Sequence, residues 1–367
     1  MKQNPFFFSG EISNYNYIPR LVLEEKLLEW VASGVKVRID GDRRIGKTSL
    51  IKSSLKNTTT LFVDLSAVKT EEAVLEAMEG ALHRKNEKLA SEVIDKVGRA
   101  LEGKSIKAGL LGEYSLNIAT SKRLDCFTEI EKILDRMNLE SKKERACVVF
   151  DEFQELLGLP DPNGFLWKLR SITQRHTNLC YIFSGSRRRE MIALFADSKA
   201  AFYKQTIHFS LQPVERKLME PWCGSLFRKN GKSLEAGVFD KIWEVTHGKT
   251  GDIQKLCHFL FENSDAGEVS TSDLKVALRA IFRADHQINT LLLRGLTAIQ
   301  QKVLKAYAIV GGKERFNADI SRISGVGNGT IKTCLNTFLN KLILFETEDG
   351  EICFDDPFLC LLLQQDY

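Results

Sequence analysis

The spacing of apolar positions follows two patterns along the chain. Up to about residue 213 it predicts strands that alternate with helices, and beyond that point it predicts mainly helices. Up to residue 213, apolar or alternating segments at 35–40, 60–65, 146–150, 179–183 and 206–213 predict strands. Helical spacing of apolar residues around them predicts helices at 21–33, 48–56 and 124–138, and two more within 71–103. Strands that alternate with helices favour a parallel sheet covered on both faces. Between glycines, residues 104–120 also indicate a small hairpin.

From residue 214 to 285 the strand pattern stops and the helical spacing continues. Four helices are expected at 214–229, 235–247, 251–264 and 271–284, with a polar turn at 247–253 that suits a lid. In the last part, helices at 297–308, from 317 and at 330–342 precede two short apolar segments that flank an Asp349-Gly350 turn. Helix–turn–helix followed by a hairpin is the order of a winged helix. We therefore expect domains at 1–213, 214–288 and 289–367.

The most specific motif lies between the first predicted strand and the helix after it. The segment fits G-x-x-x-x-G-K-[ST], the pattern of a phosphate-binding loop, or P-loop. Its residues are Gly41, Asp42, Arg43, Arg44, Ile45, Gly46, Lys47, Thr48 and Ser49. In such a loop, backbone N–H groups and the positive end of the helix face phosphate oxygens. We expect Lys47 to reach the β- and γ-phosphates of a nucleotide and Thr48 to ligate Mg²⁺.

Two carboxylates follow the apolar segment 146–150, which predicts a strand buried on both faces. In open α/β sheets, ligands lie beyond the carboxyl ends of the strands. Asp151 is therefore placed to hold Mg²⁺, directly or through water, and Glu152 to polarise a water against the γ-phosphate. An Asp-Glu pair is also a common polar strand end. Combined with the P-loop, it favours a nucleotide site.

Other candidates carry weaker signals. Ser184 ends the segment 179–183 and could touch the γ-phosphate, or it could belong to a plain Ser/Gly turn. Arg187 and Arg188 follow, and they could reach phosphate in this or a neighbouring subunit or form a solvated helix start. Tyr17 and Ile18 precede the helix at 21–33 and could form an adenine pocket or pack in the core, which periodicity does not separate.

Composition narrows the class of protein. The 367 residues are 43% hydrophobic and 27% charged, as in globular proteins with a sizeable core. A net charge of +4 neither demands nor excludes a nucleic-acid partner. The sequence contains no apolar run near 18 residues and no signal-peptide pattern, so no membrane span is expected. Eight scattered cysteines without a C-x-x-C pair suggest buried thiols in a reducing cytoplasm.

The predicted winged helix offers a second possible binding surface. Lys332 and Asn336 lie on the exposed side of the helix at 330–342 and could contact DNA bases. Acidic residues argue against this, because the hairpin carries four carboxylates and phosphate contacts dominate DNA affinity. A protein-contact or structural role is the preferred hypothesis, and DNA binding is the alternative.

The order of these motifs resembles the archaeal-type AAA+ ATPases. The resemblance rests on Asn4-Pro5-Phe6, Tyr17-Ile18-Pro19-Arg20, GDRRIGKTSL, VVFDEFQEL, FSGSRRREM and a terminal Asp356-Pro357-Phe358. These ATPases are related to the signalling (STAND) ATPases and, more distantly, to archaeal origin-recognition proteins. The resemblance implies an AAA+ core with Walker A and Walker B motifs, ATP with Mg²⁺, and a switch governed by nucleotide. It makes Glu152 the water-activating base, Ser184 a first-sensor residue and Arg20 part of the nucleotide-binding box.

Three departures from that family concern how fast ATP would turn over. The box reads Tyr-Ile-Pro-Arg where the family has Phe-x-Gly-Arg. Lys204 stands where an arginine finger is common, and lysine lacks the planar fork of arginine. In the lid, Asp252 follows Gly251 where the family has Gly-x-Pro, and it is itself a possible sensor residue. We therefore expect a slow, cytoplasmic ATPase that acts as a regulatory or assembly switch through a protein partner or its own oligomer. A DNA-associated, initiator-like or mobile-element ATPase is the alternative.

Overall fold

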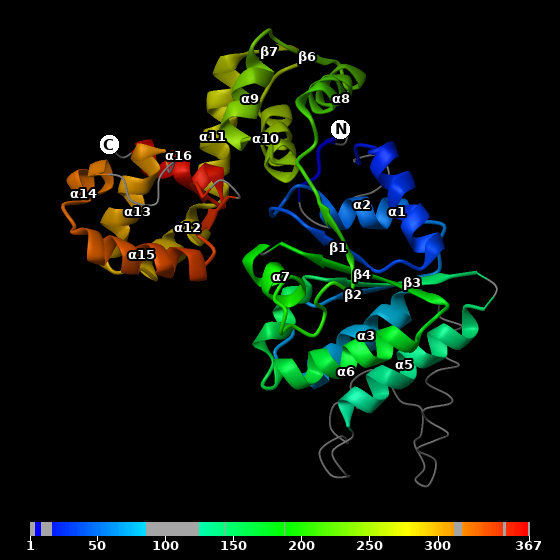
Figure 1. Ribbon diagram of the computed structural model, residues 1–367. Coiled ribbons are helices and arrows are strands. Elements are labelled where there is room, and N and C mark those ends of the chain that lie inside the picture. Colours follow the sequence, from blue (N-terminus) through cyan, green and yellow to red (C-terminus); the bar gives the residue numbers. More distant parts are fainter. Residues whose placement is uncertain are drawn as a thin grey trace, which may run out of the picture. The chain divides into compact units, whose positions relative to one another are not determined.

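The computed structural model describes residues 4–8, 17–85, 125–142, 144–186, 188–311, 318–347 and 350–365 (Figure 1). The chain divides into two compact units. The α/β unit comprises Pro19–Asp42 and Lys47–Gln212. The helical unit comprises Met1–Ile18, Arg43–Gly46 and Pro213–Tyr367. The hairpin expected at 104–120 lies outside the described residues, and the three-domain division at 213 and 288 remains a prediction.

A five-stranded parallel sheet forms the centre of the α/β unit. Its strands lie in the order β2-β3-β4-β1-β5, and every neighbouring pair is parallel, which confirms the predicted sheet. The strands are β1 (Val37–Asp40), β2 (Thr60–Asp64), β3 (Ala146–Asp151), β4 (Leu179–Gly185) and β5 (Ile207–Ser210). Every residue of β3 and β4 is buried, because helices cover both faces of the sheet.

The helices of this unit divide between the two faces of the sheet. In Figure 1, α1 and α2 lie on one face and α3, α5 and α6 lie on the other. The helices are α1 (Leu21–Ser33), α2 (Lys47–Ser54), α3 (Glu71–Lys85), α5 (Cys126–Glu140), α6 (Pro162–Arg175) and α7 (Arg188–Phe195), with a 3-10 helix, η3 (Phe153–Gly158). Aromatic side chains join η3 to the sheet, since the rings of Phe153 and Phe183 lie 4.7 Å apart. This packing fixes the chain directly after the β3 carboxylates.

The helical unit begins with α8 and contains a small sheet that the sequence did not predict. Its first helices are α8 (Arg216–Lys229), α9 (Val238–Thr246), α10 (Thr250–Glu262), α11 (Thr271–Ala284) and α12 (His286–Arg294). The strands β6 (Lys232–Leu234) and β7 (Gly267–Val269) pair in parallel between them. The expectation that residues 214–285 contain no strand was therefore wrong, because three-residue strands are too short to show a period of two.

The last elements of the helical unit follow the order required for a winged helix. They are α13 (Ala298–Val310), α14 (Ala318–Ser324), α15 (Asn328–Asn340), β8 (Leu344–Glu346), β9 (Ile352–Phe354) and α16 (Pro357–Gln365). β8 and β9 pair antiparallel, as expected for the hairpin. The winged-helix assignment itself stays a prediction. Among the described helices, none has the length and apolar character to cross a bilayer.

Candidate functional site

The P-loop forms a tight turn between β1 and α2, at the carboxyl end of the sheet. Gly46 has a φ of 93°, a left-handed conformation that glycine adopts without steric cost. Arg44 has a φ of 63° in the same turn. The buried Lys47 ammonium donates hydrogen bonds to the carbonyls of Gly41 at 2.9 Å and Asp42 at 2.8 Å. The loop therefore holds its own lysine at the start of α2, where it can meet an anion.

Thr48 and Asp151 connect the P-loop helix to the end of β3. The Thr48 hydroxyl donates a hydrogen bond of 2.7 Å to Asp151 Oδ2. Burial raises the pKa of Asp151, and the hydrogen bond from Thr48 opposes this rise only in part. A hydroxyl and a carboxylate side by side supply the oxygen ligands that Mg²⁺ prefers, so these residues fit the ion.

The Glu152 carboxylate faces the end of β4 rather than Thr48. Glu152 has a φ of 53°, and its Oε2 accepts hydrogen bonds from Gln154 Nε2 at 2.5 Å and from Ser186 Oγ at 2.6 Å. Gln154 and Ser186 were not among the candidates that the sequence predicted. Only their position near predicted site residues could have identified them. Gln154 follows Glu152 by two positions, and Ser186 follows Ser184 by two.

The remaining polar site candidates of the α/β unit differ in burial and in their contacts. Ser184 is fully buried at the end of β4, beside Asp151, and its hydroxyl partly offsets the rise in the pKa of that carboxyl. Arg187 lies outside the described residues, and Arg188 begins α7. Lys204 is exposed, with its ammonium 5.2 Å from the centre of the Tyr203 ring. Arg20 donates a hydrogen bond of 2.8 Å to the carbonyl of Gln212.

Tyr17 and Ile18 belong to the helical unit. Ile18 is 6% exposed and packs in an apolar cluster with Val214 and Met219, whereas Tyr17 is half-buried. Ile18 therefore packs in the core, which is one of the two roles that the sequence left open for it. An adenine-binding role for the pair stays a prediction.

Arg44 binds two acidic residues of the helical unit. Its guanidinium pairs with Asp252 of α10 at 2.8 Å and with Asp355, between β9 and α16, at 3.2 Å. The N–H of Gly251 also donates to the Arg44 carbonyl at 2.7 Å. Burial raises the pKa of Asp252, and the Arg44 charge opposes this rise. Asp252 was predicted as a sensor candidate, and the structure places it against the P-loop arginine.

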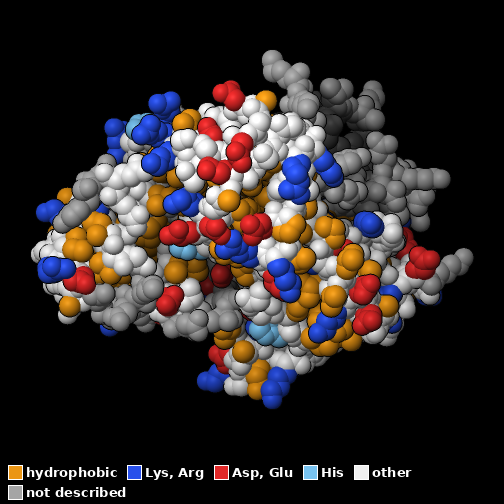
Figure 2. Space-filling view, turned by 90° about the horizontal axis from the view of Figure 1, so that it is seen from above, with side chains coloured by type: hydrophobic (Ala, Val, Ile, Leu, Met, Phe, Trp, Pro, Cys, Tyr) orange, Lys and Arg blue, Asp and Glu red, His pale blue; other side chains and the backbone are white. Residues whose placement is uncertain are grey.

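Lys332 and Asn336 are exposed on α15, one turn apart. The other side of this helix is buried through Ile331 and Leu335. The two side chains are thus available to a partner, as the sequence predicts. On the face drawn in Figure 2, acidic and basic side chains lie interspersed among apolar ones.

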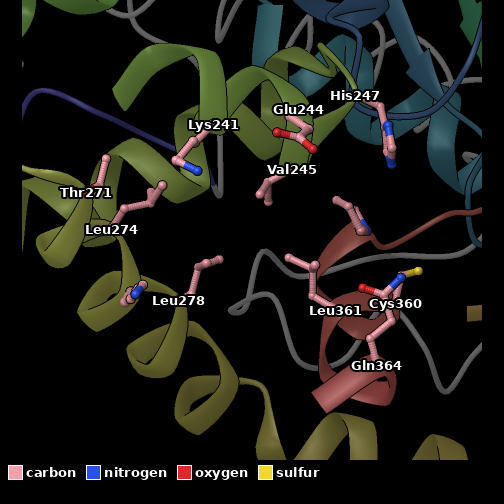
Figure 3. A pocket seen from close by; sticks show the side chains of 12 residues that line it. Lys241, Glu244, Val245, His247, Thr271, Leu274, Leu278, Cys360, Leu361 and Gln364 are labelled. Atoms are coloured by element: carbon pink, nitrogen blue, oxygen red, sulfur yellow. The ribbon is translucent and has the colours of Figure 1, made fainter. Parts of the chain in front are cut away.

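A separate pocket of about 490 Å³ lies in the helical unit, between α9, α11 and α16. Figure 3 shows apolar side chains such as Leu278 and Leu361 pointing into it, with Lys241, Glu244 and His247 around it. None of the predicted site residues lines this pocket.

Comparisons with known proteins give a family match and several solved structures of similar fold. Residues 25–256 match a family described as an ATPase domain found predominantly in Archaea. No curated protein matches the sequence. Among solved structures, a Walker-type ATPase of Pyrococcus abyssi, PABY2304, superposes with a TM-score of 0.65 at 17% identity, over 96% of this chain and 97% of that one. The ORC1 protein of Aeropyrum pernix, solved in complex with DNA, gives 0.53 at 13%, over 95% and 93%. The ORC2 protein of the same organism gives 0.52 at 14%, over 95% and 94%.

The family match covers more than half of the chain, and the structural likenesses show a shared fold. The chain therefore belongs to the family of ATPase domains found predominantly in Archaea. It is a P-loop ATPase domain, as its motifs predicted.

Proposed function

We propose that the chain binds ATP with Mg²⁺ at the P-loop and hydrolyses it slowly as a regulatory or assembly switch. The observation that supports this most is the 2.7 Å hydrogen bond between Thr48 and Asp151. This bond joins α2, the helix that follows the phosphate loop, to the acidic end of β3, as a nucleotide–metal site requires.

Each residue of the site has a distinct role in this proposal. The Lys47 ammonium exchanges its loop carbonyls for phosphate oxygens, and the loop N–H groups bind the same anion. Thr48 and Asp151 would hold Mg²⁺, which when bound neutralises charge on the β- and γ-phosphates. Glu152 accepts a proton from the attacking water, and Ser184 lies beside Asp151 as a first-sensor candidate.

Arg44 supports the switch part of the proposal. A residue of the phosphate loop is bound to Asp252 of α10 and to Asp355 beside the C-terminal hairpin. A change in the loop on nucleotide binding would therefore alter the ion pairs that α10 and the hairpin make. Lys204, in place of an arginine, favours slow turnover, because a point charge stabilises the transition state less than a bidentate fork.

The proposed switch is tested by measuring the oligomeric state of the protein with and without ATP. Mass photometry of the purified protein is expected to show an ATP-dependent change in oligomeric state, which Lys47→Ala abolishes. An unchanged mass distribution, together with no ATP-dependent capture of a protein partner, would remove the switch from the account. We place the protein in the cytoplasm, because its eight cysteines are scattered in the sequence and include no C-x-x-C pair.

DNA binding is the second candidate function, and the exposed pair on α15 favours it. Lys332 and Asn336 present a charge and an amide one turn apart, which suits contact with a duplex. The ORC1 relative of similar fold was solved in complex with DNA. Glu346 and Glu351 of the hairpin region oppose this role through repulsion of phosphates. A protein-directed output therefore remains the first proposal.

A further inference from the structure

We propose that Gln154 and Ser186 position Glu152 so that only its Oε1 atom can take the proton of the attacking water. This inference rests on the proposed role of Glu152 as the general base. Gln154 and Ser186 are positioning residues in it, because they act through the Glu152 carboxylate and not on the nucleotide.

The Oε2 atom of Glu152 has its full hydrogen-bonding capacity in use. A carboxylate oxygen offers about two lone-pair sites to donors. Gln154 Nε2 and Ser186 Oγ both donate to Oε2 of Glu152, at 2.5 and 2.6 Å. Both acceptor sites of Oε2 are therefore occupied by hydrogen bonds from uncharged side chains. A water proton has no free acceptor site on Oε2, so Oε1 is left as the base.

The Gln154 side chain is itself held in place. Gln154 is 1% exposed within η3, whose first turn is closed by a 2.9 Å hydrogen bond from the Glu155 N–H to the Glu152 carbonyl. Gly185 gives the Gln154 amide room, because a Cβ atom there would lie only 2.4 Å from Gln154 Oε1. The same Cβ would lie 2.5 Å from Met191 Sδ, so glycine at the end of β4 is a condition of this arrangement.

The neighbouring carboxylate is directed elsewhere. Asp151 Oδ2 accepts from Thr48, and Asp151 Oδ1 accepts from the Glu152 N–H at 3.2 Å. Asp151 is thus committed to the proposed metal side of the site, while Glu152 is turned toward β4. Glu152 follows β3 with a left-handed φ of 53°, so its side chain does not continue the face-to-face alternation of the strand.

The proposed step balances without a further reactant. The water oxygen forms a bond to the γ-phosphorus, and the bond from that phosphorus to the β–γ bridging oxygen breaks. The bridging oxygen leaves with ADP, and one water proton moves to Glu152 Oε1. Release of that proton to the phosphate product or to solvent restores the carboxylate. Gln154 and Ser186 keep their own protons throughout.

The test compares steady-state kinetics of single variants with those of the same changes in a Glu152→Gln background. Gln154→Leu and Ser186→Ala each remove one donor, and each is expected to lower kcat by about tenfold, a part of the 10²–10⁴ that a general base contributes. KM for ATP and the thermal stabilisation by ATP should stay unchanged. Ser186→Thr keeps a hydroxyl and should retain most of the wild-type kcat. Gln174→Leu, an identical change at an exposed position of α6, is the matched control.

The Glu152→Gln background separates positioning from a general structural effect. If Gln154 and Ser186 act only through the carboxylate, their removal causes no further loss once Glu152 is gone. The inference is overturned by wild-type kcat in both single variants, by an increase in kcat, or by an equal loss in the Glu152→Gln background. Wild-type turnover of Glu152→Gln itself would instead overturn the proposed function. If Gln154→Leu does not fold, Ser186→Ala and Ser186→Thr carry the test.

Discussion

The Thr48 hydroxyl donates a 2.7 Å hydrogen bond to the Asp151 carboxylate, although the two residues are 103 positions apart in the chain. Neither motif alone defines a site, since a glycine-rich turn and an acidic strand end are both common. The parallel sheet brings them together, because the P-loop follows β1 and Asp151 ends β3 at the same edge. The predictions below follow from this contact and from those around it.

Asp151→Asn is expected to stabilise the nucleotide-free protein at neutral pH and to abolish its response to Mg²⁺. Burial raises the pKa of Asp151 above its ordinary value of 3.8, so the folded state binds the proton more tightly than the unfolded state. The stability of the nucleotide-free protein then falls as the pH rises from 3.8 through the raised pKa. An uncharged amide removes this cost. Thermal melts from pH 4 to 8, with and without Mg²⁺, measure both effects.

The same pKa predicts how nucleotide binding responds to acid. Mg²⁺ requires the ionised carboxylate, so Mg·ATP affinity should weaken as the pH falls through the raised pKa of Asp151. Isothermal titration at several pH values checks this dependence. An Asp151→Asn protein with unchanged Mg²⁺ dependence would show that the ion is held by other groups.

Lys47→Ala is expected to remove the thermal stabilisation that ATP gives the wild-type protein. Ligand at one hundred times its Kd stabilises a folded protein by about 2.7 kcal/mol, which is readily seen in a melting curve. Lys47 is buried at the start of α2 with its ammonium on the loop carbonyls, so its loss removes a phosphate contact directly. Lys56→Ala, at an exposed position just after α2, is the control and should keep the full shift. A wild-type shift in Lys47→Ala would refute nucleotide binding at this loop.

Gly251→Ala is expected to lower the melting temperature of the protein. A Cβ atom there would lie 3.0 Å from Arg44 Cβ and 3.3 Å from the Arg44 carbonyl oxygen, so the loop would have to shift. Overpacking of this kind costs about 1–3 kcal/mol. Gly329→Ala in α15 is the control, because nothing lies within 4 Å of its added Cβ atom. Helix propensity should make the control neutral or more stable by up to about 1 kcal/mol. Equal effects in both variants would contradict the close approach of Arg44 to α10.

Lys332→Glu combined with Asn336→Ala tests whether the exposed side of α15 binds DNA. Under the protein-partner proposal, retention of the chain on duplex DNA is weak and the two substitutions leave it unchanged. If α15 binds DNA instead, the double variant loses affinity and its salt slope becomes shallower, because fewer counterions are released. Fluorescence anisotropy with labelled duplex at several salt concentrations distinguishes the two.

Most of the α/β unit could be predicted because its signals are local. The P-loop motif, the apolar residues 146–150 of β3 and the helical spacing of α5 each appear within one short window of sequence. The sheet order is not visible in such windows, since it depends on which strands pair. The β6–β7 pair was missed for a related reason, because a three-residue strand has no measurable period.

The partners of the site residues were harder to predict than the residues themselves. Arg44 and Asp252 were both candidates, but their ion pair joins positions 208 apart and no motif connects them. Gln154 and Ser186 were not singled out, since a glutamine or a serine near a motif has no distinctive pattern. Their role becomes visible only when two donors are seen on one oxygen of Glu152.

Release of phosphate from ATP by Glu152→Gln, measured beside wild type at saturating Mg·ATP, tests the account most directly. The substitution keeps the shape of the side chain and removes its basicity, so turnover should fall by at least about a hundredfold. ATP should still raise the melting temperature of this variant as it does for wild type, because Lys47 and Thr48 are intact. Turnover equal to that of wild type would contradict the assignment of Glu152 as the group that activates water.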